Sequence, residues 1–348
     1  MRVLSAMVLC LSVSVSVSAL AQEVQVIGSI DRPITVSPAT RFAAPVIKQI
    51  ALLRIALSAK ARHTFRNRLE QVQQSAPHTL GMTSVQLGMG RVPVLDQGGH
   101  GTCVTFANTA AIDAVLDRGD YISQLCLLQL GQYIENNGYN PSGWEGALGG
   151  AVLSQMDAYG IVSKANQTAV GCGGLTQYPA GGQSKTDMTP EAYHQIASAL
   201  NNTRVAWSSM LDSYQAVLDS VNMDDMLMLV KKSLNAGDRL TFGVLLPAST
   251  EGIAGAVGRY KASYDSWILT PEIVEGMASE TDLPGHEMII TGYDDAAVAV
   301  DANGQTHQGL LTLRNSWGER VGDHGDFYMS YAYFKALVLE IQRIRQLS

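Results

Sequence analysis

The sequence predicts an α+β fold, with helices through much of the first two thirds of the chain and antiparallel strands in the last third. Apolar residues recur at helical spacing in several stretches up to about residue 235, whereas the runs after Leu240 are short and rich in strand-forming residues. Asn303-Gly304 separates two of those runs and is a hairpin signal. Strands joined by tight turns pair antiparallel, so a βαβ arrangement is not expected.

The composition is that of a folded, acidic protein. Of the 348 residues, 46% are hydrophobic and 16% are charged, which is enough apolar material for one large domain or two lobes. The formal net charge of −7 argues against a nucleic-acid-binding protein, because such proteins usually present a basic face. The sequence has no metal-ligand spacing and no phosphate-binding glycine loop, so we expect no cofactor.

The first residues predict export. Met1-Arg2 supplies a small positive region, residues 3–18 are mostly apolar, and Ala19-Leu20-Ala21 has the small-x-small pattern of a signal-peptidase site. We therefore expect a signal peptide over residues 1–21 and a secreted protein, either extracellular or periplasmic. A membrane anchor is the alternative, but the stretch is short for a span and lacks a basic flank on its far side, so no stable anchor is expected.

Export makes the cysteines informative. Four are present, and removal of Cys10 with the leader leaves Cys103, Cys126 and Cys172. An odd number in an oxidising compartment implies one disulfide and one free thiol. The count alone does not say which cysteine stays free.

Residues 22–80 precede the region that carries the chemistry. Pro33 and Pro38 favour an extended chain over residues 22–40, and the spacing of Val46, Ile50 and Leu53 predicts a helix over residues 43–74. Two interpretations stay open. The segment is either a pro-segment that blocks the site until it is removed, or an N-terminal helical extension packed on the remaining domain, residues 81–348.

The rest of the chain alternates between loops and regular elements. A glycine-rich loop is expected over residues 92–102, a helix with an alanine stripe from Cys103 onward, and a second helix over residues 145–159 that ends at Gly160. Residues 166–189 are expected to be loop. The further predicted elements are helices at about 190–220 and 223–235 and strands at 240–246, 286–293, 309–315 and 326–329.

Cys103 stands where a loop becomes a helix. A thiol at a helix N-terminus lies among unpaired backbone N–H groups at the positive end of the helix dipole, which favours the thiolate. The backbone N–H of Cys103 and the side-chain amide of Gln97 are candidates for holding a developing oxyanion. The intervening glycines allow the loop to fold back toward the thiol.

Two later motifs supply partners for such a thiol. His286 opens one apolar strand, and Asn315 closes another. An amide oxygen that accepts the imidazole N–H would fix the ring tautomer and leave the other nitrogen to exchange a proton with the thiol. Trp317 is placed to shield that hydrogen bond from water.

These motifs together resemble the papain family of cysteine peptidases. The similar features are Gln97 six residues before Cys103, Gly285-His286 before an apolar strand, and Asn315-Ser316-Trp317-Gly318. The resemblance implies a two-lobed fold, with a helical left lobe, an antiparallel β-rich right lobe and the active site in the cleft between them. It also implies that Cys103 is the nucleophile, His286 the acid and base, Asn315 its orienting residue and Gln97 the oxyanion donor.

The chain also departs from the family pattern. His100 stands where the family usually has a cysteine, and Val104 stands where it has an aromatic residue. His100 is either a loop histidine without a chemical role or a residue that tunes the thiol. The resemblance implies a bridge between Cys126 and Cys172. It further indicates an insertion around residues 182–235, for which a lid or an exosite is a possible role.

The expected function is therefore that of a secreted cysteine peptidase, which hydrolyses peptide bonds through a thioester on Cys103. Its expected partners are a protein or peptide substrate and, within the chain, the possible pro-segment at residues 22–80. Two alternatives keep the fold: an acyltransferase or amidase of transglutaminase type, and a catalytically silent binding module.

Overall fold

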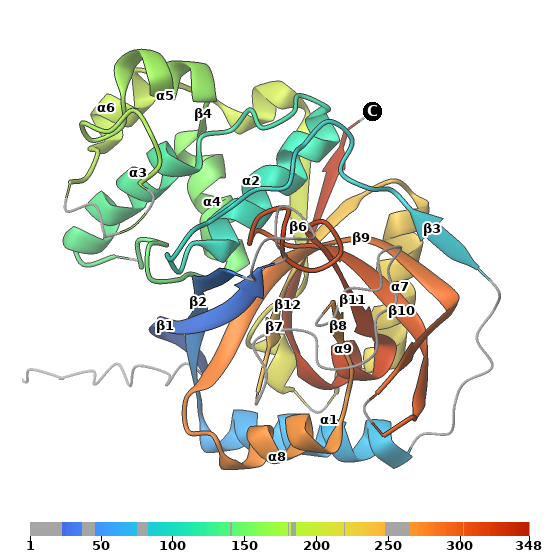
Figure 1. Ribbon diagram of the computed structural model, residues 1–348. Coiled ribbons are helices and arrows are strands. Elements are labelled where there is room, and N and C mark those ends of the chain that lie inside the picture. Colours follow the sequence, from blue (N-terminus) through green and yellow to red (C-terminus); the bar gives the residue numbers. More distant parts are fainter. Residues whose placement is uncertain are drawn as a thin grey trace, which may run out of the picture.

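The computed structural model describes residues 23–36, 46–74, 83–139, 141–179, 181, 186–218, 220–247, 265–301 and 303–347. The predicted leader, residues 1–21, lies outside the described residues. The predicted α+β class is confirmed: one part of the chain forms a helical lobe and another forms a large, mostly antiparallel sheet (Figure 1). Within the described residues, no helix is long and apolar enough to cross a membrane.

The helical lobe corresponds to the predicted left lobe. Ser123 and Ser163 cap the helices that follow them, because each hydroxyl accepts a backbone N–H of the first turn. Cys126 and Cys172 form a disulfide in this lobe. The lobe contains α2 (Cys103–Leu116), α3 (Gln124–Asn136), α4 (Gly149–Tyr159), α5 (Lys164–Val170), α6 (Pro190–His194), the short strands β4 (Ile161–Val162) and β5 (Ala197–Ser198), and the 3₁₀ turn η1 (Leu200–Thr203).

The right lobe is built around the sheet. Its main path runs in the order β6-β12-β7-β9-β10-β11-β8. These strands are β6 (Val205–Leu211), β7 (Arg239–Leu245), β8 (Ser266–Trp267), β9 (Leu283–Val300), β10 (Thr306–Arg314), β11 (Asp326–Ser330) and β12 (Val338–Gln346). The elements packed around the sheet are α1 (Ala59–Gln74), η2 (Gln215–Val217), α7 (Met223–Asn235), α8 (Pro271–Ser279) and α9 (Tyr331–Leu337), and β3 (Ser84–Gln86) pairs with β9.

Strand β9 organises this lobe. Its first half is almost entirely buried, because β7 pairs with it on one side while α2 packs across its face. Strand β10 pairs along the other side of β9 but ends at Arg314, which is opposite Ile289. Beyond that point the same side of β9 is taken up by strand β2 (Val46–Leu57), from Leu53 opposite Gly285. A gap in pairing is therefore left on this side, and His286 lies in it.

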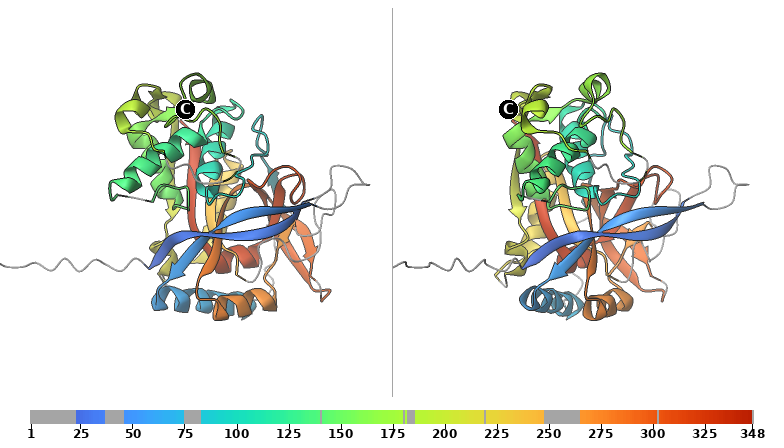
Figure 2. Two further views of the ribbon diagram at one scale, coloured as in Figure 1. Left: turned by 60° about the vertical axis from the view of Figure 1, so that its left-hand side comes forward. Right: turned by 90° about the vertical axis from the view of Figure 1, so that its left-hand side faces the viewer.

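The N-terminal segment is a hairpin followed by a helix, so the prediction of one helix over residues 43–74 is wrong in its first half. Strand β1 (Val24–Val36) pairs antiparallel with β2, and the helix α1 begins only at Ala59. Figure 2 shows the hairpin running between the helical lobe and the sheet lobe. Residues 46–57 become a strand because they bury Ile50–Leu53 and complete the edge of β9, and this pairing outweighs their helical spacing.

Two later predictions also need correction. The segment at 190–220 is not one helix, since its second half forms β6, which pairs antiparallel with β12. Residues 166–189 include the end of helix α5, where only loop was expected. In the described part of the predicted insertion at 182–235, β6 is an edge strand of the sheet, and α7 packs on β7, β9 and α9.

Candidate active site

The thiol of Cys103 lies at the first residue of α2. Thr102 is the N-cap, and its side chain makes no capping bond, so the backbone N–H groups of the first turn point at the thiol region. The N–H groups of Glu287, Val104 and Cys103 act on the sulfur and lower its pKa in part. The Glu287 N–H belongs to the peptide that joins it to His286. The structure thus places the predicted nucleophile against β9 at the predicted base.

The predicted imidazole–amide pair is present. His286 Nε2 and Asn315 Oδ1 are 2.7 Å apart, and the same oxygen accepts the backbone N–H of Ser316 at 2.7 Å. Because Oδ1 is the acceptor in both bonds, His286 Nε2 is the donor, and the neutral ring carries its proton there. Nδ1 is buried without a partner. The ring of Trp317 packs on the imidazole, with a centroid distance of 4.7 Å, and shields the pair from solvent.

Gln97 is fully buried, and its amide is held on both sides. Ser316 Oγ donates to Gln97 Oε1 at 2.7 Å, which fixes the orientation of the amide. Nε2 donates to the carbonyl of His100 at 2.8 Å and to that of Ala51 at 3.1 Å. Ser316 was not among the predicted site residues. Its place in the Asn-Ser-Trp-Gly motif, next to the orienting asparagine, was the signal for it.

The donor of Gln97 is therefore occupied by the N-terminal hairpin, since Ala51 belongs to β2. The same hairpin touches both lobes around the site. Lys48 Nζ donates to Asp96 Oδ1 at 2.5 Å and to the Trp317 carbonyl at 2.9 Å, while Ser29 Oγ donates to the Glu145 carboxylate on the helical lobe. A chain that lies across these groups excludes a substrate from them.

Glycines let the hairpin approach this closely. Gly146 has a backbone φ of +116°, and a Cβ there would come within 2.8 Å of Leu53 and 2.7 Å of Val26. A Cβ on Gly285 would come within 2.8 Å of Ile55. Real Cβ atoms do not approach other atoms so closely, so these two glycines are needed for the hairpin to lie in the cleft.

The covered site is uncharged. Burial raises the pKa of the Cys103 thiol to about 12, and the nearby carboxyl of Glu287 acts in the same direction. Burial lowers the pKa of His286 to about 4, against the opposing hydrogen bond to Asn315. Both side chains are fully buried, so the sequence-based expectation of a thiolate does not hold for this closed form. In this closed form the thiol and the imidazole are both neutral, so the thiol is not in its reactive, ionised form.

Tyr178 is a second residue that sequence reasoning missed. Its hydroxyl donates to the Gln97 carbonyl at 2.9 Å, so the 2.9 Å bond to Thr102 must be donated by the threonine. It thereby ties the residue before Cys103 to the oxyanion loop. His100 packs edge-on against Tyr178 and Trp144 and is 5% exposed, which gives it a packing role in the same loop. No local pattern marks Tyr178, because it lies far along the chain.

A buried acid pair lies behind the thiol. Glu287 Oε1 accepts from Asn108 Nδ2 at 2.7 Å, and Glu340 Oε1 accepts the backbone N–H of Gly149 at 2.8 Å. Glu287 Oε2 and Gln342 Oε1 are both buried acceptors without a donor. Burial raises the pKa of Glu287 well above its usual range, and the neighbouring Glu340 raises it further. This cluster therefore has to hold at least one proton.

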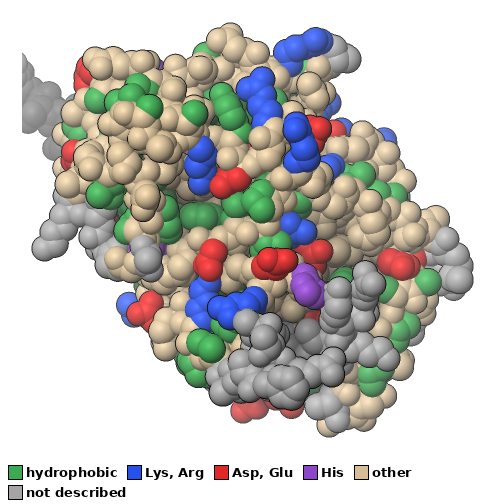
Figure 3. All heavy atoms as spheres, turned by 45° about the horizontal axis from the view of Figure 1, so that its top comes forward, with side chains coloured by type: hydrophobic (Ala, Val, Ile, Leu, Met, Phe, Trp, Pro, Cys, Tyr) green, Lys and Arg blue, Asp and Glu red, His purple; other side chains and the backbone are tan. Residues whose placement is uncertain are grey.

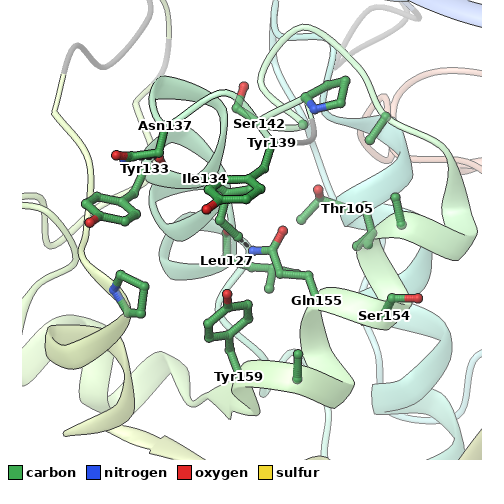
Figure 4. Close-up of a pocket in the computed structure, with 17 residues that line it drawn as sticks. Thr105, Leu127, Tyr133, Ile134, Asn137, Tyr139, Ser142, Ser154, Gln155 and Tyr159 are labelled. Carbon is green, nitrogen blue, oxygen red and sulfur yellow. Dashed lines mark hydrogen bonds between the residues drawn. The ribbon is translucent and has the colours of Figure 1, made fainter. Parts of the chain in front are cut away.

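A pocket of about 460 Å³ lies in the helical lobe, away from the predicted catalytic residues. Figure 4 shows it between α3, α4 and the loop before Gly143, with Tyr133, Tyr139 and Tyr159 around it. The cavity beside Asn315 and Glu287 holds only about 10 Å³. Within the part of the chain that the structure describes, no group of His, Cys, Asp and Glu side chains is arranged to hold a metal ion.

A free thiol at a helix start, an imidazole held by an amide oxygen and a buried glutamine amide define a site of the cysteine-peptidase type. Residues 190–346 match the model of the Peptidase C1-like family, and the resemblance to papain-like cysteine peptidases is thereby confirmed. The matched part carries His286, Asn315 and Trp317, while Gln97 and Cys103 precede it. No curated protein sequence matches the chain.

Solved structures similar to this chain are cysteine proteases and their precursors. Xylellain from Xylella fastidiosa is 19% identical, with a TM-score of 0.46 over 80% of this chain and 90% of that one. Procathepsin L 3 from Tenebrio molitor is 17% identical, with a TM-score of 0.46 over 82% and 79%. The recombinant stem bromelain precursor is 17% identical, with a TM-score of 0.44 over 76% and 70%. At these values the likeness carries no argument about activity or substrate.

Proposed function

We propose that this chain is an exported cysteine peptidase, made as a zymogen, that hydrolyses peptide bonds through a thioester on Cys103. The observation that supports it most is the His286–Asn315 bond, which leaves His286 Nδ1 without a partner, while the N–H of the next residue, Glu287, acts on the sulfur of Cys103. In the open form, His286 would take the thiol proton and later give it to the leaving amine. Gln97 and the N–H groups at the start of α2 would hold the oxyanion.

The zymogen part of the proposal rests on the hairpin. Ala51 fills the amide donor of Gln97, and β2 runs past Gly285 beside the histidine. A removable hairpin explains why a complete set of catalytic groups is buried and uncharged. We propose that residues 22–80 are a pro-segment and residues 81–348 the peptidase domain. N-terminal sequencing of the active exported form should then begin near residue 80, after loss of the signal peptide.

The central test is chemical labelling combined with a digest. The active form should be alkylated by iodoacetamide at Cys103, should cleave members of a peptide library, and should lose both properties in Cys103→Ala. Full hydrolysis by Cys103→Ala would refute the proposal. The Cys126→Ala/Cys172→Ala variant is the control for loss of cysteines in general, because it removes the disulfide and keeps the thiol of Cys103.

A silent binding module is favoured by one observation, namely the burial of Cys103 and His286. It predicts no labelling of Cys103 even after the hairpin has been cut. An acyltransferase or amidase would label Cys103 in the same way as a peptidase. Incorporation of a primary amine into a peptide without hydrolysis would identify the acyltransferase.

A further inference from the structure

Lys48 of the hairpin donates to two acceptors that lie outside the hairpin. Its Nζ donates to Asp96 Oδ1 at 2.5 Å and to the Trp317 carbonyl at 2.9 Å. Asp96 directly precedes Gln97, and Trp317 packs on His286. Both acceptors remain at the site when the hairpin is gone. They then form a place for a cation beside the catalytic groups.

The fold builds this place from two loops. Asp96 and Trp317 form an isolated antiparallel bridge, and the Gly318 N–H donates to the Leu95 carbonyl at 3.0 Å. Gly318 has a φ of +87°, and a Cβ there would lie 2.9 Å from Asp96 Oδ2. The Gly98 N–H donates to Asp96 Oδ1 at 2.9 Å and fixes the carboxylate. The carboxylate and the Trp317 carbonyl are thus held near each other without help from the hairpin.

The chemistry of the proposed reaction determines which part of a substrate lies beside Asp96 and the Trp317 carbonyl. Gln97 marks the position of the scissile carbonyl oxygen, and His286 delivers its proton to the leaving amine. Trp317 lies on the imidazole, so it marks the leaving-group side of the cleft. Strand β2 runs from Lys48 at Trp317, through Ala51 at Gln97, to Leu53 at Gly285. Its direction is opposite to that of a cleavable substrate, and Lys48 takes the place of a residue beyond the scissile bond.

We propose that Asp96 and the Trp317 carbonyl form a subsite for a lysine or arginine side chain on the leaving-group side of the substrate. This inference rests on the proposed peptidase function and names its substrate class. Acidic and basic side chains are interspersed on the face shown in Figure 3, so selectivity for a cation has to come from a local pair such as this one. Asp96 is about half exposed, so the preference is modest and depends on salt.

The test compares matched peptides that carry lysine or norleucine at each of the positions after the scissile bond. The activated protein should cleave the lysine peptide with a kcat/KM about two- to fivefold higher at one of these positions, and salt should reduce the difference. Asp96→Asn should abolish the preference. Asp117→Asn, which removes an exposed carboxylate paired with Arg91, should retain it.

Failure of the proposed subsite and failure of the proposed peptidase function give different results in these experiments. If the protein cleaves the peptides with no lysine preference, or if Asp96→Asn keeps that preference, the subsite is wrong and the peptidase function stands. If no condition gives cleavage, the peptidase function fails. The binding of the same two peptides to Cys103→Ser protein whose hairpin has been cut away, measured by fluorescence anisotropy, then decides the subsite: equal affinity refutes it, and a lysine preference that Asp96→Asn removes supports it.

Discussion

At the scale of single residues, the site is defined by hydrogen bonds that permit one arrangement of protons. Asn315 Oδ1 accepts from both the Ser316 N–H and the His286 ring, which leaves Nδ1 as the only free base on that ring. Ser316 does a second task, because its hydroxyl holds the amide of Gln97. Neighbouring residues of one motif thus orient both the base and the oxyanion donor.

Removal of these groups should therefore affect the rate more than the binding of substrate. In the activated protein, Gln97→Ala should lower kcat by about 10²- to 10³-fold, because it removes an oxyanion donor. Ser316→Ala should cost about tenfold, since the amide stays but loses the bond that orients it. Steady-state kinetics on one peptide measure both. Ser154→Ala, an exposed serine bonded only to the Gly150 carbonyl, is the matched control and should leave kcat unchanged.

The residues to which we assign the proposed chemistry could be picked out from the sequence because their signals are local. A helix that begins at Cys103, a histidine on an apolar strand and an asparagine at a strand end are all visible in a few consecutive residues. Tyr178 and the Asn108–Glu287 bond were not predictable, because each joins residues that only the fold brings together. A blocking segment was one of two interpretations of residues 22–80, but the sequence did not show that the part over the site is a hairpin.

At the scale of elements, the errors share one physical cause. Residues 46–57 and 205–211 were predicted as helix and form β2 and β6. Strand β2 pairs along most of its length with β1 and over Leu53–Ile55 with the distant β9, and β6 pairs with the distant β12. Short apolar runs have no strong preference of their own, so the partner decides. The amphipathic helix α7 was predicted correctly at residues 223–235, and the structure shows that Asn222 caps it.

The hairpin offers a test at this scale. Leu53→Asp places a charge against Gly146 and Gly285 and should detach β2 from the cleft. Exposure of Cys103 brings its pKa down from about 12 toward its usual range near 9.0, so alkylation at pH 7.5 should be at least about tenfold faster. Labelling by iodoacetamide, followed by mass mapping, measures the rate.

A matched substitution separates detachment from general destabilisation. Met228 is exposed on α7, so Met228→Asp introduces the same charge without touching the hairpin. It should label as slowly as the unaltered chain. Equal rates for Leu53→Asp and the unaltered chain would show that the hairpin does not control access to the thiol.

At the scale of the whole molecule, the two lobes meet over a buried acid cluster. Asn108 and Gly149 come from helices of the left lobe, while Glu287 and Glu340 come from strands of the sheet. The groups that act on the two carboxyls are Glu340 on Glu287, Asn108, Thr241, Gln342, the N–H groups of Gly149 and Gly150, and Asp212, and none of them is basic. Among the described residues, these groups supply no cation to compensate a second negative charge.

The lobe interface should consequently weaken as the pH rises. The folded pKa of Glu287 is raised above its ordinary value of 4.5, so the folded state holds its proton more tightly. The stability from this proton is fully present below pH 4.5 and is lost as the pH rises through the folded pKa. His286 acts in the opposite sense between about pH 4 and 6.5, because its folded pKa is lowered.

His286 is the same in Glu287→Gln and in the unaltered chain, so a comparison of the two proteins isolates the carboxyl of Glu287. From pH 4.5 upward, the free energy of unfolding in urea should fall with pH in the unaltered chain relative to Glu287→Gln, until the folded pKa of Glu287 is passed. Asp225→Asn changes an exposed residue in the first turn of α7. Its free energy of unfolding should depend on pH with the same slope as that of the unaltered chain. Identical slopes in Glu287→Gln and the unaltered chain would contradict the assignment.

The burial of Cys103 also bears on oxidation. An exposed low-pKa thiolate is converted by oxidants first to sulfenic acid and then to products that cannot be reversed. A sulfur that is neutral and inaccessible reacts slowly, whatever the redox state of its surroundings. On the proposed function, the hairpin would therefore protect the nucleophile from oxidation as well as block the site. Oxidising conditions that form the bridge between Cys126 and Cys172 would leave Cys103 reduced until the hairpin is removed.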